Sequence, residues 1–181
     1  MPELKRLMVF VDNSNIFRGS LSLGIKVDYQ KMVDFLSNGA FDEKYDLLRV
    51  IMYCTVDRSK SEDQIRAQEW LYDKFNSFHK FDVKKFTLKT IRDGNGNVIE
   101  KYEKGVDTAL VTDLLLLATK GAFDVAIVCA GDADFIKAIE GVKDMGIQIY
   151  VASFDHSCSK DLKSVSLGYV SLTNNCAKFT Y

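Results

Sequence analysis

Apolar runs of strand length alternate along this chain with segments of helical periodicity, and this alternation constrains the fold more than any other feature. The segments that we expect to form strands are 7–12, 47–54, 81–89, 124–131, 147–154 and 169–173. Those that we expect to form helices are 27–39, 61–78, 106–122, 133–146 and 159–168. Strands joined through helices favour parallel pairing, because a parallel connection needs a long crossover. The sequence therefore predicts an α/β fold, a Rossmann-like three-layer α/β/α sandwich with a mainly parallel central sheet.

Local signals add detail to this arrangement. Ser61 and Gln64 have the spacing of a capping box at the start of the second helical segment. We expect the apolar stripe of that segment to pack in the core; it consists of Ile65, Trp70, Leu71 and Phe75. The glycine-rich segment 92–97 predicts a turn, after which 98–103 pairs back as a hairpin. The residues that follow position 12 read as a polar turn.

Length and composition bound the class of protein. A chain of 181 residues with 47% hydrophobic residues is long enough for one full core, so we expect a single domain over residues 1–181. No stretch approaches the roughly 20 apolar residues of a membrane span, and the N-terminal residues lack a signal peptide. The four cysteines show no metal-ligand spacing, which favours free thiols in a reduced, cytoplasmic protein.

Carboxylates stand where predicted strands and helices begin or end. Asp12 follows the first strand, Asp132 and Asp134 follow the run 124–131, and Asp107 opens a helix. Parallel strands end at one edge of a sheet, where open α/β sheets build their sites. Clustered carboxylates repel one another, and a hard cation such as Mg²⁺ or Mn²⁺ holds them together at neutral pH. The sequence therefore suggests a metal-dependent active site.

These residue types suit the hydrolysis of a phosphodiester. Metal ions held by carboxylates can supply a hydroxide near neutral pH and stabilise charge on the phosphate oxygens. Asn15 can donate to a phosphate oxygen, and Lys104 is a candidate contact for the incoming backbone phosphate. Although the net charge is −1, setting four clustered aspartates aside leaves +3, so overall charge does not exclude a nucleic-acid partner.

Each of these residues also has an ordinary structural interpretation. Asp is a preferred N-cap, so Asp12, Asp107 and Asp132 could simply begin helices. Asp113 lies about 240° around an ideal helix from Asp107 and is at most a supporting residue. A second group, after the strand 47–54, could stack a base or contact phosphate, although a solvated loop is the simpler reading; it consists of Tyr53, Arg58 and Lys60.

Other enzyme classes lack their required residues. A phosphatase of the haloacid-dehalogenase type needs a second acid after the first strand, where this chain reads DNSN. A phospho-acceptor receiver domain needs an acceptor aspartate at the middle strand end, where this chain has Tyr53 and Cys54. No glycine-rich phosphate loop of the GxxxxGK[ST] or GxGxxG kind occurs. These three readings are therefore disfavoured.

Three segments resemble the NYN domain family, a branch of the PIN-like nuclease superfamily. They are VDNSN at 11–15, KGVDTALVTD at 104–113, and AGDADF at 130–135, the last followed by MGIQIYVAS. The resemblance covers residues 7–153 and implies a PIN-like α/β/α sandwich whose acidic residues bind Mg²⁺ or Mn²⁺ for RNA cleavage. Many PIN-like nucleases act as dimers, so a homodimer is possible.

Carried over by position, the resemblance makes Asp12, Asp107, Asp132 and Asp134 the catalytic and metal-binding acids. It also makes Asn15 the polar partner of the first acid. The turn after the fourth main strand often reads SGDSDF in relatives, and here Ala130 and Ala133 replace both serines. The function expected is that of a metal-dependent endoribonuclease. The alternative is a module on the same fold that binds RNA or a protein and hardly cleaves.

Overall fold

In a computed structural model, which describes residues 4–41, 43–103 and 105–181, a seven-stranded sheet forms the centre of the molecule. The strands are β1 (Arg6–Asp12), β2 (Asp46–Asp57), β3 (Phe81–Arg92), β4 (Val98–Glu103), β5 (Val125–Cys129), β6 (Gln148–Ser153) and β7 (Gly168–Ser171). Their spatial order is β4-β3-β2-β1-β5-β6-β7, and every neighbouring pair is parallel except β3 with β4. The predicted mainly parallel sheet is confirmed.

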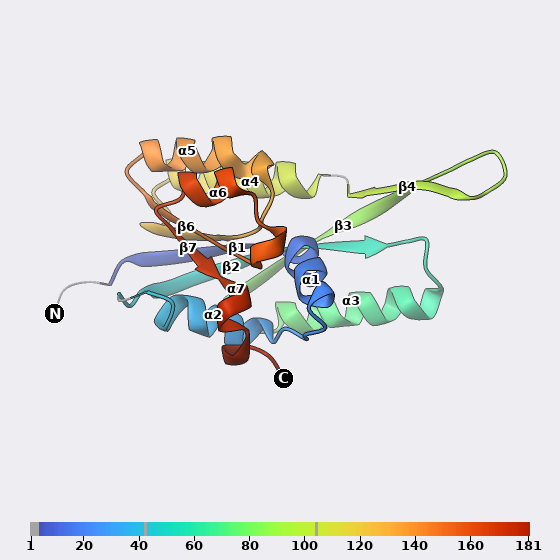
Figure 1. Ribbon diagram of the computed structural model, residues 1–181, viewed down its shortest axis with the longest axis horizontal. Helices are drawn as coiled ribbons and strands as arrows, with labels where there is room; N and C mark the ends of the chain where they lie inside the picture. Colours follow the sequence, from blue (N-terminus) through green and yellow to red (C-terminus); the bar gives the residue numbers. More distant parts are fainter. Residues whose placement is uncertain (1–3, 42, 104) are drawn as a thin grey trace.

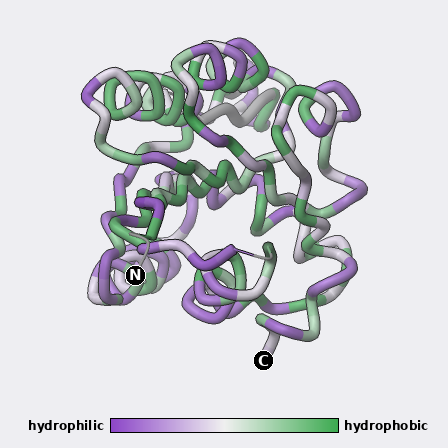
Figure 2. The backbone as a smooth tube through the Cα atoms, turned by 90° about the vertical axis from the view of Figure 1, so that its left-hand side faces the viewer, coloured by the Kyte–Doolittle hydropathy of each residue, from purple (hydrophilic) through white to green (hydrophobic). Residues whose placement is uncertain are grey.

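Helices cover both faces of this sheet (Figure 1). They are α1 (Asn13–Ser22), α2 (Tyr29–Asn38), α3 (Glu62–Asn76), α4 (Val106–Thr119), α5 (Ile136–Asp144), α6 (Lys160–Val165) and α7 (Leu172–Asn175). Short 3₁₀ turns lie at η1 (Ala133–Phe135), η2 (Asp155–Ser157) and η3 (Cys176–Lys178). Figure 2 shows the hydrophobic strands enclosed between the two helical layers. The predicted three-layer α/β/α sandwich is therefore confirmed.

Alternation along the strands divides the core in two, because successive side chains of a strand point to opposite faces. On β1, Val9 and Val11 pack with residues of α1, α2 and α3. Met8 and Phe10 instead pack with residues of α4, α5 and α6. A strand buried on both faces reads as a continuous apolar run, which is why LMVFV was a clear strand signal.

The β3–β4 hairpin extends away from the rest of the sheet (Figure 1). Its turn is organised by Asp93, whose Oδ1 accepts hydrogen bonds from the main-chain N–H groups of Asn95 (2.9 Å) and Asn97 (2.8 Å). A hydrogen bond from the Asn97 side chain, together with these main-chain bonds, holds the pKa of Asp93 below its usual range. The predicted turn and hairpin are confirmed.

Two local expectations were wrong. Residues Asn13–Ser22 form helix α1, where the sequence suggested only a polar turn. In α3, Trp70 is 65% exposed and Leu71 39% exposed, although both were assigned to the core. The buried face of α3 is instead set by Tyr72 and Phe75, three residues apart. Trp70 precedes Tyr72 by two residues, which is about 200° around the helix, so it faces solvent.

In the part of the chain that the structure describes, no helix has the length and apolar character needed to cross a membrane. The four cysteines are free thiols, of which Cys54 and Cys129 are buried. The capping box at Ser61 and Gln64 is present with both of its hydrogen bonds, as predicted.

Candidate functional site

The first and fifth strands bring two of the predicted acids to one edge of the sheet. Strands β1 and β5 are adjacent and parallel, with Val11 opposite Cys129. Asp12 is the next residue on β1, and Asp132 lies three residues beyond Cys129. Both aspartates therefore leave the sheet at the same edge, where its parallel strands have their carboxyl ends.

Each of these aspartates begins the element that follows it. Asp12 Oδ1 accepts a hydrogen bond from the main-chain N–H of Asn15 at 3.1 Å and caps α1. Asp132 Oδ1 accepts one from the N–H of Asp134 at 3.0 Å and caps η1. The structural interpretation of both residues as N-caps is thus confirmed. An ionised carboxylate has about four acceptor positions, so a cap bond does not use up its capacity to accept further hydrogen bonds or hold a cation.

The two acids differ in burial. Asp12 is only 7% exposed, whereas Asp132 and Asp134 are both exposed. Burial makes an ionised carboxylate costly unless hydrogen bonds or positive charge compensate it. Asp12 is thus the candidate acid whose charge is least screened by water, and Asp132 and Asp134 face the solvent from which a substrate would arrive.

Asn15 connects the same edge to the next strand. Its side-chain Oδ1 accepts a hydrogen bond from Ser153 Oγ at 3.4 Å, and Ser153 is the fully buried last residue of β6. The ends of β1, β5 and β6 therefore meet at this place. Ser153 was not identified from the sequence, although its position at the end of a predicted strand is a signal that could have been used.

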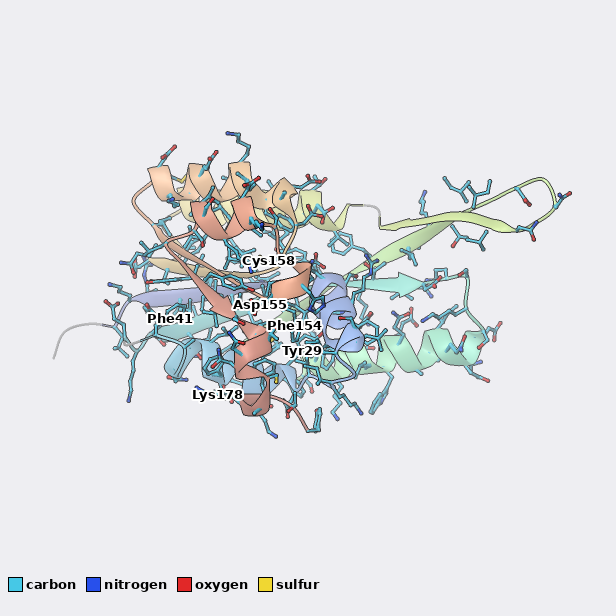
Figure 3. All side chains as sticks on the ribbon, viewed as in Figure 1. Tyr29, Phe41, Phe154, Asp155, Cys158 and Lys178 are labelled. Atoms are coloured by element: carbon cyan, nitrogen blue, oxygen red, sulfur yellow. The ribbon has the colours of Figure 1, made fainter. Side chains whose placement is uncertain are left out.

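The turn that carries Asp132 depends on close packing at Gly131. A Cβ atom at this position would lie 1.9 Å from the carbonyl oxygen of Ser157 in η2. The Gly131 carbonyl also accepts a hydrogen bond from the N–H of Ser159 at 2.9 Å. Only glycine allows η2 to approach so closely. The contact between Gly131 and residues 157–159 therefore holds in place the turn that carries Asp132. Figure 3 shows the nearby Phe154 and Asp155 beside α1.

Asp107 lies in the first turn of α4 and is exposed. The N-cap of this helix is Gly105, which has a φ of 90° and makes no side-chain cap bond. The interpretation of Asp107 as a helix cap is therefore wrong. A carboxylate in the first helical turn still interacts favourably with the helix dipole.

Asp113 belongs to a different contact. Its Oδ2 accepts hydrogen bonds from Tyr53 Oη at 2.7 Å and Lys84 Nζ at 2.6 Å. Tyr53 is fully buried, so the expectation of a stacking residue or a solvated loop was wrong for this position. Burial, together with the bond to Asp113, raises the pKa of Tyr53 well above its usual range. Asp113 thereby fastens α4 to β2 and β3.

The three basic residues that were considered as phosphate contacts have different surroundings. Arg58 forms an ion pair of 2.8 Å with Glu69 of α3. Lys60 lines a cavity beside α1. Lys104 lies outside the described residues.

That cavity has a volume of about 510 Å³ and begins at the residues directly after Asp12. Asn13 and Tyr29 form part of its wall, with Tyr29 Oη donating to Asn13 Oδ1 at 2.6 Å. Burial raises the pKa of Tyr29 well above its usual range, and the charge of Asp12 adds to this shift. The cavity was not predicted, because it requires the unexpected helix α1.

The oxygen donors at this edge of the sheet bear on whether a metal ion could bind there. Among residues 4–41, 43–103 and 105–181, no group of three histidine, cysteine or acidic side chains is arranged to hold a metal. The chemistry of the available donors is nevertheless that of Mg²⁺ or Mn²⁺, since they are carboxylate oxygens. Mg²⁺ commonly keeps several waters and takes one or two protein carboxylates together with substrate phosphates. Asp12 and Asp132 suit that kind of site.

Comparisons with known proteins agree with this fold. The family model described as NYN domain matches residues 6–173. A solved structure of a protein of unknown function from Vibrio parahaemolyticus RIMD 2210633 is similar over 100% of both chains, with a TM-score of 0.66 and 16% identity. The nicotinamidase of Staphylococcus aureus has a TM-score of only 0.35 at 11% identity, over 90% of this chain and 89% of its own, and supports no argument. None of the curated proteins matches this chain.

Proposed function

Because this chain belongs to the NYN domain family, which has a PIN-like nuclease fold and generally acts on RNA, we propose that it is a metal-dependent endoribonuclease. The observation that carries this proposal is the placement of Asp12 and Asp132. They follow adjacent parallel strands, leave the sheet at the same edge, and present carboxylate oxygens there.

In this proposal Asp12 and Asp132 hold Mg²⁺ or Mn²⁺, with Asp107 and Asp134 as further acids of the same site. When bound, the cation lowers the pKa of a water molecule and stabilises negative charge on the phosphate oxygens. The cap bonds from Asn15 and Asp134 fix the orientation of the two carboxylates before substrate arrives. Such pre-organisation avoids the cost of reorienting these groups during the reaction.

Two further residues are assigned to the substrate. Asn15 would donate its amide N–H to a non-bridging phosphate oxygen, because its Oδ1 is oriented by Ser153. Lys104 would contact the neighbouring backbone phosphate. Asn15 would orient the scissile phosphate at the edge where Asp12 and Asp132 lie, and orientation alone can supply a large part of a rate enhancement.

The test is cleavage of end-labelled single-stranded and structured RNA with Mn²⁺ or Mg²⁺, for wild type and Asp12→Asn. Asn is as good an N-cap as Asp, so this variant keeps the start of α1 and loses only a charged oxygen. Asp28→Asn is the matched control, because Asp28 caps α2 through the same kind of bond, to the N–H of Lys31. Binding of Mn²⁺ measured by calorimetry gives a second readout.

We expect Asp12→Asn to lose cleavage and to bind Mn²⁺ more weakly, whereas Asp28→Asn behaves as wild type. If wild type with Mn²⁺ cleaves no faster than Asp12→Asn across several RNAs, the catalytic proposal fails. RNA binding that persists in that case would identify the protein as a binding module.

A further inference from the structure

The cavity beside α1 lies next to the proposed catalytic edge. Asn13 and Ser14, which form part of its lining, directly follow Asp12 in the chain. The opposite side is formed by α3, including Ala67, Gln68 and Leu71. Its volume of about 510 Å³ is within the range of roughly 300–1,000 Å³ that is usual for ligand sites. A group bound there would therefore be held close to Asp12.

The lining is aromatic at its base and at its rim. Tyr29, Tyr72 and Phe75 are buried and form a ring cluster, with centroids 5.1 Å apart for Tyr29 and Phe75 and 6.3 Å for Tyr72 and Phe75. Phe17 of α1 is 56% exposed, and Leu71 of α3 is 39% exposed. Large apolar side chains left in water beside a cavity suit a planar ligand that can stack on them.

Polar groups fix the shape of this cavity from within. Gln68 Nε2 donates to the Thr55 carbonyl at 2.8 Å and approaches Tyr72 Oη at 2.9 Å. Gln68 Oε1 accepts from the N–H of Asp57 at 3.1 Å. These bonds tie α3 to the end of β2, so the walls are set without a ligand. A pre-formed site binds more tightly, because less ordering is needed on binding.

The charges around the opening suit a phosphodiester chain. Lys60 and Arg18 contribute two positive charges to the lining, against one negative charge from Asp57. Cations beside an aromatic platform are the combination by which proteins bind single-stranded nucleic acid. The bases of a duplex are stacked on one another, so only an unpaired base could enter such a recess.

We propose that this cavity holds the base of a nucleotide adjacent to the scissile phosphate of single-stranded RNA. The inference rests on the proposed function, which it deepens by assigning a substrate class. The scissile phosphate would lie beside Asp12. The neighbouring base would enter the cavity and contact the side chains of Phe17 and Leu71. The nuclease would thereby require an unpaired nucleotide next to the cleaved bond.

The first experiment uses the four ribonucleoside 5′-monophosphates as probes and ribose 5-phosphate as the probe without a base. Binding is followed by NMR through the main-chain amides of Asn13, Ser14 and Leu71. We expect at least one nucleotide to shift these amides in a saturable manner, and ribose 5-phosphate to bind at least about tenfold more weakly. Equal shifts with both kinds of probe, or shifts only elsewhere, would overturn the inference.

The second experiment fills the cavity. Ala67 is exposed on α3 and lines the cavity, so Ala67→Phe occupies the space without removing core packing. Ala177→Phe makes the same change at an exposed alanine outside the lining. Affinity for single-stranded RNA is measured in EDTA, which separates binding from cleavage. We expect Ala67→Phe to weaken binding about tenfold and Ala177→Phe to have no effect.

Phe17→Ala provides a second test at a half-exposed position where the fold loses little packing, and we expect a loss of about fivefold. Wild-type RNA affinity in both cavity variants would overturn the inference and leave the proposed function intact. Failure of wild type to bind any RNA would overturn both. Unchanged nucleotide binding in Ala67→Phe would likewise place the base elsewhere and refute the cavity alone.

Discussion

The adjacent strands β1 and β5 have Asp124 at their amino edge and Asp12 and Asp132 at their carboxyl edge, and the acids of the two edges have opposite kinds of partner. At the amino ends, Asp124 is enclosed by Arg6: Oδ1 accepts from Nη2 at 2.8 Å, and Oδ2 accepts from Nε at 3.1 Å and from the main-chain N–H at 2.9 Å. At the carboxyl ends, Asp12 and Asp132 accept from main-chain N–H groups that begin the next elements. The amino ends of these two strands are thus joined by an ion pair, whereas their carboxyl ends are followed by carboxylates that cap the next elements.

The two edges differ in the charge that remains on their acids. A guanidinium cancels the charge of Asp124, and nothing is left to attract a cation. A main-chain amide has only a partial charge, so Asp132 remains a net anion, and within the described residues it forms no ion pair. The charge of Asp124 is thus neutralised by the fold, whereas the charge of Asp132 remains available to the cation that we propose.

The largest expected effect concerns Asp132→Asn. We expect cleavage to fall at least about 100-fold, because several kcal/mol of metal-dependent stabilisation can be lost and each 1.36 kcal/mol is tenfold in rate. The free energy of unfolding should change by less than about 0.5 kcal/mol, since Asn caps as well as Asp. Single-turnover cleavage and urea unfolding measure the two quantities. Asp124→Asn, at the amino edge, should keep full cleavage. An equal loss of cleavage in both variants would show that the two edges do not differ in function.

Gly131→Ala tests the packing that supports the carboxyl edge. The new Cβ would overlap the Ser157 carbonyl, so we expect a loss of about 1–3 kcal/mol in the free energy of unfolding. Urea unfolding gives this value. Gly94→Ala is the control, because nothing lies within 4 Å of a Cβ at that position, and it should change stability little. A wild-type value for Gly131→Ala would show that the turn relaxes freely.

The ion pair at the amino edge should contribute stability that depends on pH. Hydrogen bonds from Arg6 lower the pKa of Asp124 in the folded protein. The stabilisation is therefore fully present above the unfolded pKa of about 3.9 and is lost as pH falls through the folded pKa. Both side chains are over 40% exposed, so we expect Asp124→Asn to cost only about 0.5–1 kcal/mol at pH 7. Urea unfolding at pH 7 and pH 3 should show this cost shrinking in acid.

The smallest effect is expected for Lys104→Ala, which removes one proposed phosphate contact. RNA affinity at about 0.1 M salt should fall only a few-fold, and the slope of log K against log salt should flatten by about 0.7. Lys120→Ala, directly after the last residue of α4, is the matched control and should leave the slope unchanged. Both affinities are measured by fluorescence anisotropy. A flatter salt dependence in Lys104→Ala but not in Lys120→Ala would show that Lys104 contacts the RNA backbone.

Much of the fold could be predicted because its strands are buried on both faces and stand out as apolar runs. Helix α1 could not, since its buried residues include Asn13, Gly19 and Ser20, which give no hydrophobic stripe. Small residues are needed there for close approach: a Cβ at Gly19 would lie 2.6 Å from Phe154. Contacts of that kind depend on distant segments, and a local pattern does not contain them.

The candidate site was predictable in part for the same reason. Strand ends locate Asp12 and Asp132 because parallel strands end together, and this follows from periodicity alone. Which residues surround the acids depends on long-range packing. Tyr53 looked like a surface residue but lies under α4 with its hydroxyl on Asp113, and the cavity formed by α1, β2 and α3 has no signal in any one of those segments.

The double use of Asp12 and Asp132 has a consequence for descent. Each residue both starts an element and presents the charge proposed for catalysis, and the two roles need different atoms. An Asp→Asn substitution replaces one carboxylate oxygen by an amide nitrogen. It keeps the hydrogen bond that caps the following helix and removes the negative charge. A homologue with this fold can therefore lose the proposed activity through one substitution that leaves its structure unchanged. An asparagine at either position would then mark a homologue that binds RNA without cleaving it.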